Sequence, residues 1–383
     1  MSYTANAPLL PRSDASWFTE WRRTLDWGLV AGVVILISVG LLMSLAAGPS
    51  AAARTGQSDP YFYIYRQTAF SAAGFTVLMA VSLLDRKWAR RFAALVFLGS
   101  IALMIALLGI GHEAKGAQRW LRFAGVSLQP SEMVKPALIL LCGWLLAQRE
   151  HYPKGPWTLM AFGAYAATLT LLLLQPDVGQ SVLVTAAFLT VFFISGLPKR
   201  WVVIFAGGGA ALAFLLYSLL PYVRSRITMI LNPTSADTFQ IDRAAEAISR
   251  GGLLGAGPGE GLIKARLPDA HTDFILAVMA EEYGLVAILA LIGVYALMAI
   301  RGFRAAGRIE DGYARTAAAG LFTLFSLQAA INIGVNLAIL PPTGMTLPFV
   351  SSGGSSMVGM GLTLGLALAL VRGEGTRSPG RYG

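Results

Sequence analysis

The chain contains the stretch Leu267-Pro-Asp-Ala-His-Thr-Asp-Phe-Ile-Leu-Ala-Val-Met-Ala-Glu-Glu-Tyr-Gly284, which begins with polar residues and becomes apolar after Asp273. The apolar run continues to about Ile300, which is long enough for a helix that crosses a membrane. The sequence therefore predicts that Asp273 lies at the mouth of a membrane helix, where water meets hydrocarbon.

Asp273 has two interpretations at this stage. An Asp at a helix start commonly caps free backbone N–H groups, but Asp269 and Thr272 are also available for capping. Glu281 and Glu282 follow inside the same predicted span, and Glu281 would lie on the order of 12 Å deeper than Asp273 in a straight helix. Because ionisable groups at that depth usually line a polar cavity or a pathway, the stretch also fits a functional site.

Composition predicts a membrane protein. Of the 383 residues, 55% are hydrophobic and 13% are charged, and the mean hydropathy is +0.62, whereas soluble domains carry about 25% charged residues. The apolar runs are too long for the alternating strands of a β-barrel. The single cysteine, Cys142, excludes a disulfide framework. We expect an all-α integral membrane protein forming one polytopic domain over residues 1–383.

Hydropathy predicts about ten membrane helices. The first apolar run is too long for the apolar region of a signal peptide and is predicted to be a retained span. The ten spans are expected at approximately 27–47, 61–84, 92–111, 132–147, 157–174, 179–196, 202–220, 273–300, 316–340 and 349–371.

Charge predicts the topology. With an even number of spans, both tails and every second connecting segment lie on the same side of the membrane. More than half of the 30 Lys and Arg residues lie in these short segments. Short segments rich in Lys and Arg are cytoplasmic. The tails 1–26 and 372–383 are therefore expected in the cytoplasm, and the long segments 112–135 and 221–272 outside. The second of these is the large loop between spans seven and eight. The net charge of +10 is a topology signal, so nucleic acid is not an expected partner.

The first outer segment carries Arg119 and Trp120, which fit an interfacial anchor. Glu132 and Lys135 are three residues apart at the start of a span, so they share a helix face and can pair. Burial of both near the membrane suggests a polar cavity. Asp177, between two spans, is by default a turn residue.

The later outer segments are rich in glycine and proline. Residues 239–250 form a short amphipathic helix, and the glycines of 251–261 lack the Lys and Ser/Thr of a phosphate loop, so they are expected to let the backbone fold tightly. The 332–356 segment contains three prolines and a Ser/Gly run, and irregular backbone at membrane depth must be buried in protein or line a cavity. Gly361 and Gly365 have the spacing of a helix-packing face.

Three motifs together carry a resemblance over essentially the whole chain. These are Gly116-Ala-Gln-Arg-Trp120 leading to Gln129-Pro-Ser-Glu132, then Pro268-Asp-Ala-His-Thr-Asp-Phe274, and the 332–356 segment. The sequence resembles the SEDS family (shape, elongation, division and sporulation) of polytopic peptidoglycan polymerases, and its cell-division branch more than its elongation branch. Two residues depart from the family pattern: Ser352 replaces the usual Tyr, and Ala338 replaces the usual Gly. Both departures concern the local shape of the last outer loop.

The resemblance implies that Asp273 is the catalytic carboxylate. It also implies lipid II as the substrate and a class b penicillin-binding transpeptidase and other divisome membrane proteins as partners. The location would be the bacterial inner membrane, with the site facing the periplasm. The candidate substrate-binding residues are Lys135, Glu132, Arg119, Trp120, Arg224, Arg243, His271, Ser351 and Ser355.

The expected chemistry needs one base and several cations. A positioned carboxylate can take the proton of the acceptor hydroxyl, and cations can stabilise the departing pyrophosphate. Lys135 is the first choice, ahead of Arg119, Arg122, Arg224, Arg226 and Arg243. A divalent cation such as Mg or Mn could share this role, with Asp273, Glu132 and Asp177 as available ligands, but no dense ligand cluster supports a committed metal site.

Two other functions remain open from the sequence. A lipid flippase would also use buried charges and helices interrupted by proline loops, and it would depend on Glu281 and Glu282 more than on Asp273. A non-catalytic membrane scaffold leaves the buried charges unexplained.

Overall fold

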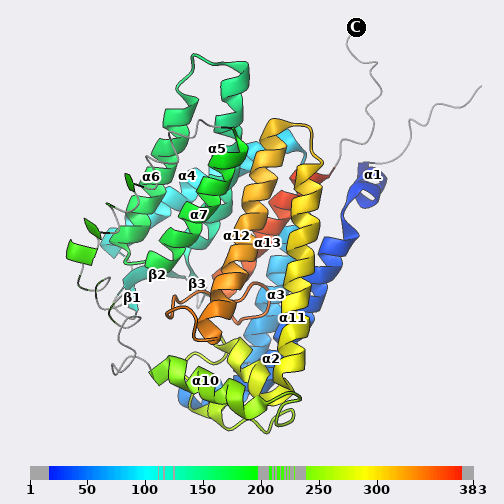
Figure 1. The fold of residues 1–383 in the computed structure, drawn as a ribbon, viewed down its shortest axis with the longest axis vertical. Coiled ribbons are helices and arrows are strands. Elements are labelled where there is room, and N and C mark those ends of the chain that lie inside the picture. The colour runs from blue at the N-terminus through cyan, green and yellow to red at the C-terminus, as the bar shows by residue number, and fades with distance from the viewer. Residues whose placement is uncertain are drawn as a thin grey trace, which may run out of the picture.

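The computed structural model describes residues 17–110, 112–114, 117–123, 126–196 and 239–372, with scattered helical residues between 207 and 228. The described chain is a bundle of long helices with a helical cap, α10, at one end (Figure 1). The helices are α1 Trp17–Thr24, α2 Trp27–Arg54, α3 Phe62–Ser82, α4 Arg86–Ile110, α5 Pro130–His151, α6 Trp157–Leu174, α7 Val178–Ile194, α10 Phe239–Gly251, α11 Ile275–Gly307, α12 Gly312–Asn336 and α13 Gly354–Val371, with a 3₁₀ turn η2 at Ile263–Ala265.

Within the described residues, seven helices are long and apolar enough to cross a membrane: α2, α4, α5, α6, α11, α12 and α13. This confirms a helical, multi-pass membrane protein. Helices also occupy the expected spans at 61–84 and 179–196, as α3 and α7. The expected span at 202–220 and the first part of the 221–272 loop lie largely outside the described residues, so the count of ten stays a prediction.

The segment between α4 and α5 is not helical. The strands β1 His112–Ala114, β2 Ala117–Phe123 and β3 Val126–Leu128 form an antiparallel sheet in the order β1-β2-β3. Leu121 pairs with Leu128, and Phe123 with Val126. Neighbouring strands satisfy one another's backbone groups in a segment too short and too polar for another span. This small sheet adds to the all-α membrane fold, which the helices confirm.

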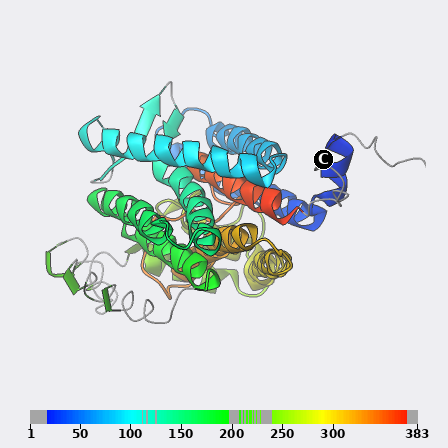
Figure 2. The same cartoon turned by 90° about the horizontal axis from the view of Figure 1, so that it is seen from above.

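The centre of the bundle is formed by α5, α12 and α13, in which most residues are buried. In Figure 2, α13 and α5 lie between α3 and α4 on one side and α6, α7 and α12 on the other. A Cβ atom at Gly361 would lie 2.2 Å from the Gly74 carbonyl oxygen, and one at Gly365 would lie 2.9 Å from that of Leu78. The predicted glycine packing face is therefore confirmed, and it packs against α3.

The predicted span at 273–300 is not one straight helix. Gly284 has φ 76° and ψ −176°, which breaks α11 into a short first part and a long second part. The break is filled by the glycine-rich segment: the Leu285 amide donates to the Gly252 oxygen (2.9 Å), and the Ala256 amide donates to the Glu281 oxygen (2.8 Å). The tight backbone predicted for these glycines is confirmed. The break comes after Glu281, so the depth expected for Glu281 relative to Asp273 stays a prediction.

The departure at Ala338 has a structural meaning. Helix α12 ends with Leu337 as its C-cap, and Ala338, the next residue, has φ 59°. This left-handed position after a helix is usually occupied by glycine, because a Cβ atom is strained there.

We therefore expect Ala338→Gly to raise the free energy of unfolding by about 1 kcal/mol. The measurement is thermal unfolding of purified protein in lipid nanodiscs. Ala330, which is exposed in the interior of α12, supplies the matched control: Ala330→Gly should lower stability by about 1 kcal/mol. A loss of stability in both variants would contradict the strain at Ala338.

Candidate active site

Asp273 lies directly before α11, with its side chain half-buried. Its backbone oxygen accepts hydrogen bonds from the Nδ2 atoms of Asn332 and Asn336, both at 2.9 Å. The Oδ1 atom of Asn336 accepts from the Ala277 amide at 3.1 Å, inside the first turn of α11. Two buried asparagines of α12 therefore position the backbone that carries the Asp273 carboxylate.

These asparagines belong to a polar stripe on α12, formed by Gln328, Asn332 and Asn336. Their spacing of four residues places them on one face of the helix. Gln328 Nε2 donates to the Thr346 oxygen (3.1 Å), and Asn332 Nδ2 also donates to the Met345 oxygen (2.7 Å). The irregular segment predicted at 332–356 is thus buried against this stripe. Sequence reasoning did not select the asparagines, although amides repeated every four residues inside a predicted span were a visible signal.

Asn336 yields a prediction about positioning. Asn336→Ala removes one of the two donors to the Asp273 oxygen and the acceptor of the Ala277 amide, so we expect the free energy of unfolding to fall by about 1–3 kcal/mol. Displacement of the carboxylate should lower kcat on the order of tenfold or more, with little change in KM. Thermal unfolding and steady-state polymerisation kinetics measure the two effects.

The control for Asn336 lies on the same helix. Thr323 is partly buried, and its hydroxyl donates only to the Ala319 oxygen one turn earlier, so Thr323→Ala should change kcat little. If the Asn336→Ala variant has the same kcat as the wild type, Asn336 does not position the Asp273 carboxylate.

Lys135 forms the centre of a buried polar network. Its Nζ atom lies 3.0 Å from Glu132 Oε2, 2.7 Å from Gln180 Oε1 and 3.1 Å from Gln328 Oε1. Gln180 Nε2 donates to Glu132 Oε1 at 2.9 Å. The predicted pairing of Glu132 with Lys135 is confirmed. The Lys135 side chain is completely buried, so in this arrangement its charge interacts with these protein side chains. The same side chains fill the expected polar cavity.

Arg119 fixes the turn between α6 and α7. Its Nε atom donates to the Gln175 oxygen (2.6 Å), its Nη2 atom donates to the Pro176 oxygen, and its Nη1 atom lies 3.5 Å from Asp177 Oδ2. Asp177 caps α7 by accepting from the Gln180 amide, so it is more than a turn residue. Burial raises the pKa of the Asp177 carboxyl above its usual value, and the nearby Arg119 guanidinium opposes this rise.

Three further candidates lie on the loops around Asp273 or at the start of α13, and a fourth, Trp120, lies in β2. Ser355 Oγ accepts from the Gln129 amide (2.9 Å) and donates to the Ser127 oxygen (3.0 Å), which joins β3 to α13. Ser351 Oγ accepts from the Leu347 amide (2.9 Å). The His271 ring lies 4.4 Å from the Tyr63 ring, and the His271 oxygen accepts from the Ser352 amide at 2.9 Å. Trp120 is half-buried in β2.

Two candidate cations lie apart from this cluster. Arg243 pairs with Glu246 on the outer face of α10 and lies over the Phe239 ring. Arg224 is exposed and lies over the Tyr217 ring. Arg226 and the side chain of Arg122 fall outside the described residues.

Arg54 is a cation that sequence reasoning missed. It ends α2, and its Nη1 atom donates to the Leu267 oxygen, at the start of the segment that leads to Asp273. The available signal was a single arginine at the C-terminal end of the first apolar run. Arg54 therefore brings a positive charge to the approach to Asp273.

Glu281 and Glu282 both have partners inside the protein. Glu281 accepts backbone hydrogen bonds from Leu262 (2.7 Å), Ile263 (2.8 Å) and Lys264 (3.1 Å). Glu282 forms an ion pair with the Lys264 side chain. The two carboxylates thus attach the 259–264 segment to the first part of α11. A groove of about 540 Å³ lies beside this attachment, with Leu42 and Leu45 among its apolar residues and Lys264 and Glu282 among its polar ones.

The carboxylates considered as metal ligands do not come together. No group of three or more His, Cys, Asp or Glu residues is close enough to hold a metal ion in the described part of the chain. Glu132 faces Lys135, and Asp177 faces Arg119.

Comparisons with known proteins show the family to which the chain belongs. A family model described as "cell cycle protein", which covers FtsW, RodA and SpoVE, matches residues 27–374. The chain belongs to this family. A probable peptidoglycan glycosyltransferase FtsW from Caulobacter vibrioides is 48% identical over 97% of this chain and 94% of that protein. The protein of the same name from Geobacter metallireducens is 33% identical over 90% and 93%.

Solved structures of the FtsW, RodA and SpoVE family share the fold. One belongs to a peptidoglycan synthase complex, described as coordinating polymerization and crosslinking, with a TM-score of 0.75, 29% identity, and coverage of 91% of this chain and 98% of that chain. The rod shape determining protein RodA of Thermus thermophilus gives a TM-score of 0.67, 29% identity, and coverage of 91% and 97%. The resemblance to SEDS proteins, and to their cell-division branch, is confirmed by the identities to FtsW proteins.

Proposed function

We propose that this protein is a peptidoglycan glycosyltransferase that polymerises lipid II into glycan strands during septal wall synthesis. The position of Asp273 carries the proposal: a half-buried carboxylate precedes a membrane helix, and two buried asparagines hold its backbone. The activity is also that named for the Caulobacter vibrioides relative. An elongation-type polymerase of the RodA kind is the close alternative, and septal or lateral location of a fluorescent fusion separates the two.

In the proposed reaction, Asp273 is the general base. It takes the proton of the sugar 4-hydroxyl of the acceptor as the oxygen bonds to the anomeric carbon of the donor. The bond from that carbon to undecaprenyl pyrophosphate breaks, and the electron pair leaves with the pyrophosphate. Since pyrophosphate leaves readily once its charge is neutralised, the reaction needs cations rather than a second acid. Displacement at one face inverts the anomeric carbon, so an α-linked product would contradict this mechanism.

The surrounding residues have two roles in this proposal. Arg54 supplies an accessible positive charge near Asp273, while Lys135, Glu132, Arg119, Ser351 and Ser355 maintain the framework of the site through the contacts described above. Trp120 and His271 would contact the sugar and peptide parts of the substrate. If a Mg or Mn ion takes part, Asp273 would be the residue that holds it, and the ion would supply positive charge for the departing pyrophosphate. The groove beside Leu42 and Leu45 suits a prenyl chain.

The proposed topology places Asp273 in the periplasm and both tails, 1–26 and 372–383, in the cytoplasm of one polytopic domain. The basic end of α11 and the amphipathic helix α1 lie at the end of the bundle opposite α10 (Figure 1), as short positive segments would on the cytoplasmic side. A class b penicillin-binding transpeptidase is the proposed partner among divisome proteins, since a structural relative belongs to a complex for polymerization and crosslinking.

The test is polymerisation of lipid II by the purified protein with its cognate transpeptidase. Long glycan strands would support the proposal. A flippase would instead move labelled lipid II across vesicles without making polymer, and Glu281→Gln with Glu282→Gln would stop this movement. A scaffold would do neither. The partners of the two glutamates favour the polymerase, because both carboxylates already hold a loop.

A further inference from the structure

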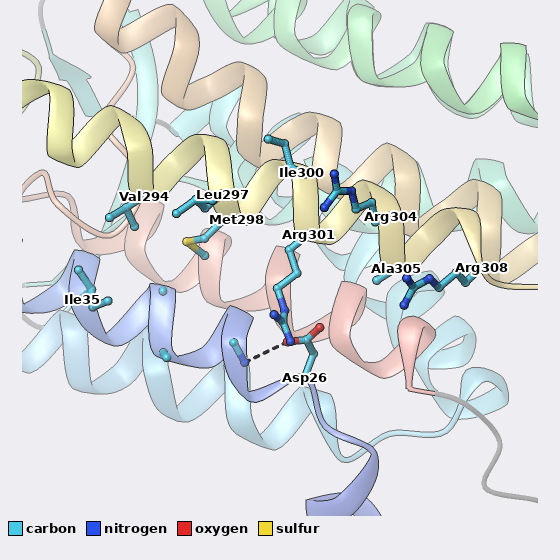
Figure 3. Close-up of a pocket in the computed structure, with 13 residues that line it drawn as sticks. Asp26, Ile35, Val294, Leu297, Met298, Ile300, Arg301, Arg304, Ala305 and Arg308 are labelled. Carbon is cyan, nitrogen blue, oxygen red and sulfur yellow. Dashed lines mark hydrogen bonds and ion pairs between the residues drawn. The ribbon is translucent and has the colours of Figure 1, made fainter.

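A second groove lies at the end of the bundle opposite Asp273. It has a volume of about 560 Å³ and runs between the start of α2 and the last turns of α11 (Figure 3). Its apolar wall includes Ile35, Val294 and Leu297. Ile35 and Leu297 are exposed, so this wall faces the surroundings of the bundle, which in a membrane are lipid chains.

Two glycines of α2 shape the groove. A Cβ atom at Gly28 would lie 2.5 Å from Arg301 Cζ, and one at Gly32 would lie 2.6 Å from Met298 Sδ. The α2 surface is therefore bare backbone here, and the side chains of α11 lie directly against it. The missing side chains allow Met298 and Arg301 to lie against the α2 backbone, where they form part of the groove lining.

The rim of the groove has surplus positive charge. Arg301 Nε lies 2.7 Å from Asp26 Oδ1, and Asp26 also caps α2. The side chains of Arg304 and Arg308 are exposed and, among the described residues, have no hydrogen-bond or ion-pair partner. Figure 3 shows Arg301, Arg304 and Arg308 following one another along α11, with Asp26 beside Arg301 only. One carboxylate thus faces three guanidinium groups.

Neighbouring aromatic residues place this rim at headgroup level. Trp27, the first residue of α2, is 48% exposed, and Trp17 on α1 is 69% exposed. Exposed Trp residues beside Arg side chains are typical of the membrane–water interface. The arginines therefore lie where lipid phosphates lie, and the apolar wall lies where acyl chains begin.

We propose that this groove binds one anionic glycerophospholipid, with its phosphate at Arg304 and Arg308 and its acyl chains along Ile35, Val294 and Leu297. Guanidinium groups match phosphate oxygens in geometry and charge, and basic pockets between membrane helices are suited to anionic headgroups. A partner's apolar helix would leave both arginines without a counter-charge, so the charge of the rim favours the lipid.

The experiment measures lipid retention by the purified full chain with native mass spectrometry. The probes are dioleoylphosphatidylglycerol and zwitterionic dioleoylphosphatidylcholine, added separately. The variant Arg304→Gln/Arg308→Gln should bind phosphatidylglycerol about 30-fold more weakly than the wild type, whereas phosphatidylcholine binding should not change. The variant Arg304→Lys/Arg308→Lys, which keeps the charge, should restore most of the affinity.

The matched control is Lys87→Gln/Arg91→Gln on α4. These residues are also exposed and four apart, and they lie on the same side of the membrane, because Arg86 contacts Asp311 at the start of α12. The control should bind phosphatidylglycerol like the wild type. Equal loss in both Gln variants would overturn the proposal in favour of general surface charge. If the variant Arg304→Gln/Arg308→Gln binds phosphatidylglycerol like the wild type but no longer binds the transpeptidase, the groove binds a protein partner and the proposal is overturned.

Discussion

Asp273→Asn is expected to lower the rate of glycan polymerisation at least 100-fold, because an amide cannot take the proton of the acceptor hydroxyl. The substitution keeps the size and shape of the side chain. It also keeps the two hydrogen bonds from Asn332 and Asn336, since these end on the backbone oxygen of residue 273. The variant should therefore fold and bind its partner and substrate while losing the chemical step.

The measurement is strand formation from lipid II by purified variant and wild type, each with the cognate transpeptidase. Asp269→Asn is the matched control. Asp269 lies four residues earlier with φ 52°, a conformation that Asn tolerates well, so this variant should retain most of its activity. Equal strand formation by Asp273→Asn and wild type would exclude Asp273 as the base.

Lys135→Met is expected to destabilise the protein by about 3–5 kcal/mol, because it leaves the Glu132 carboxylate buried without its counter-charge. Glu132→Gln leaves the Lys135 ammonium with the two glutamine oxygens and should have a similar but smaller effect. The double variant Glu132→Gln/Lys135→Met removes both charges, so it should recover much of the stability lost in Lys135→Met. Thermal unfolding of the three variants gives the coupling between the two residues.

The same variants separate a structural from a catalytic role of Lys135. If the ammonium serves only the buried network, the double variant should polymerise lipid II at a rate near that of the wild type. If the double variant recovers its stability but not its polymerisation rate, Lys135 reaches the substrate. This would require an arrangement of the side chains different from the closed network with Glu132, Gln180 and Gln328. No coupling between the two residues would contradict the burial of the pair.

The sequence by itself determined the class of fold and most of the helices, and it singled out Asp273 as the candidate carboxylate. Long apolar runs are sufficient for this, because a backbone in hydrocarbon must satisfy its hydrogen bonds within each segment, so each run predicts its own helix. The α6 bounds and the α5 pair of Glu132 and Lys135 follow from such local patterns. Asp273 drew attention because its position at the start of an apolar run is also a local property, and the family resemblance implied its role.

The tertiary structure alone decided which polar groups of different segments contact one another. The break at Gly284, the attachment of Glu281 to residues 262–264 and the asparagines that hold Asp273 all join segments far apart in the sequence. Their roles depend on which helices are neighbours, and hydropathy does not specify this because apolar helix faces resemble one another. The lipid groove between α2 and α11 has the same origin: two glycines and three arginines form one surface only because these helices pack side by side.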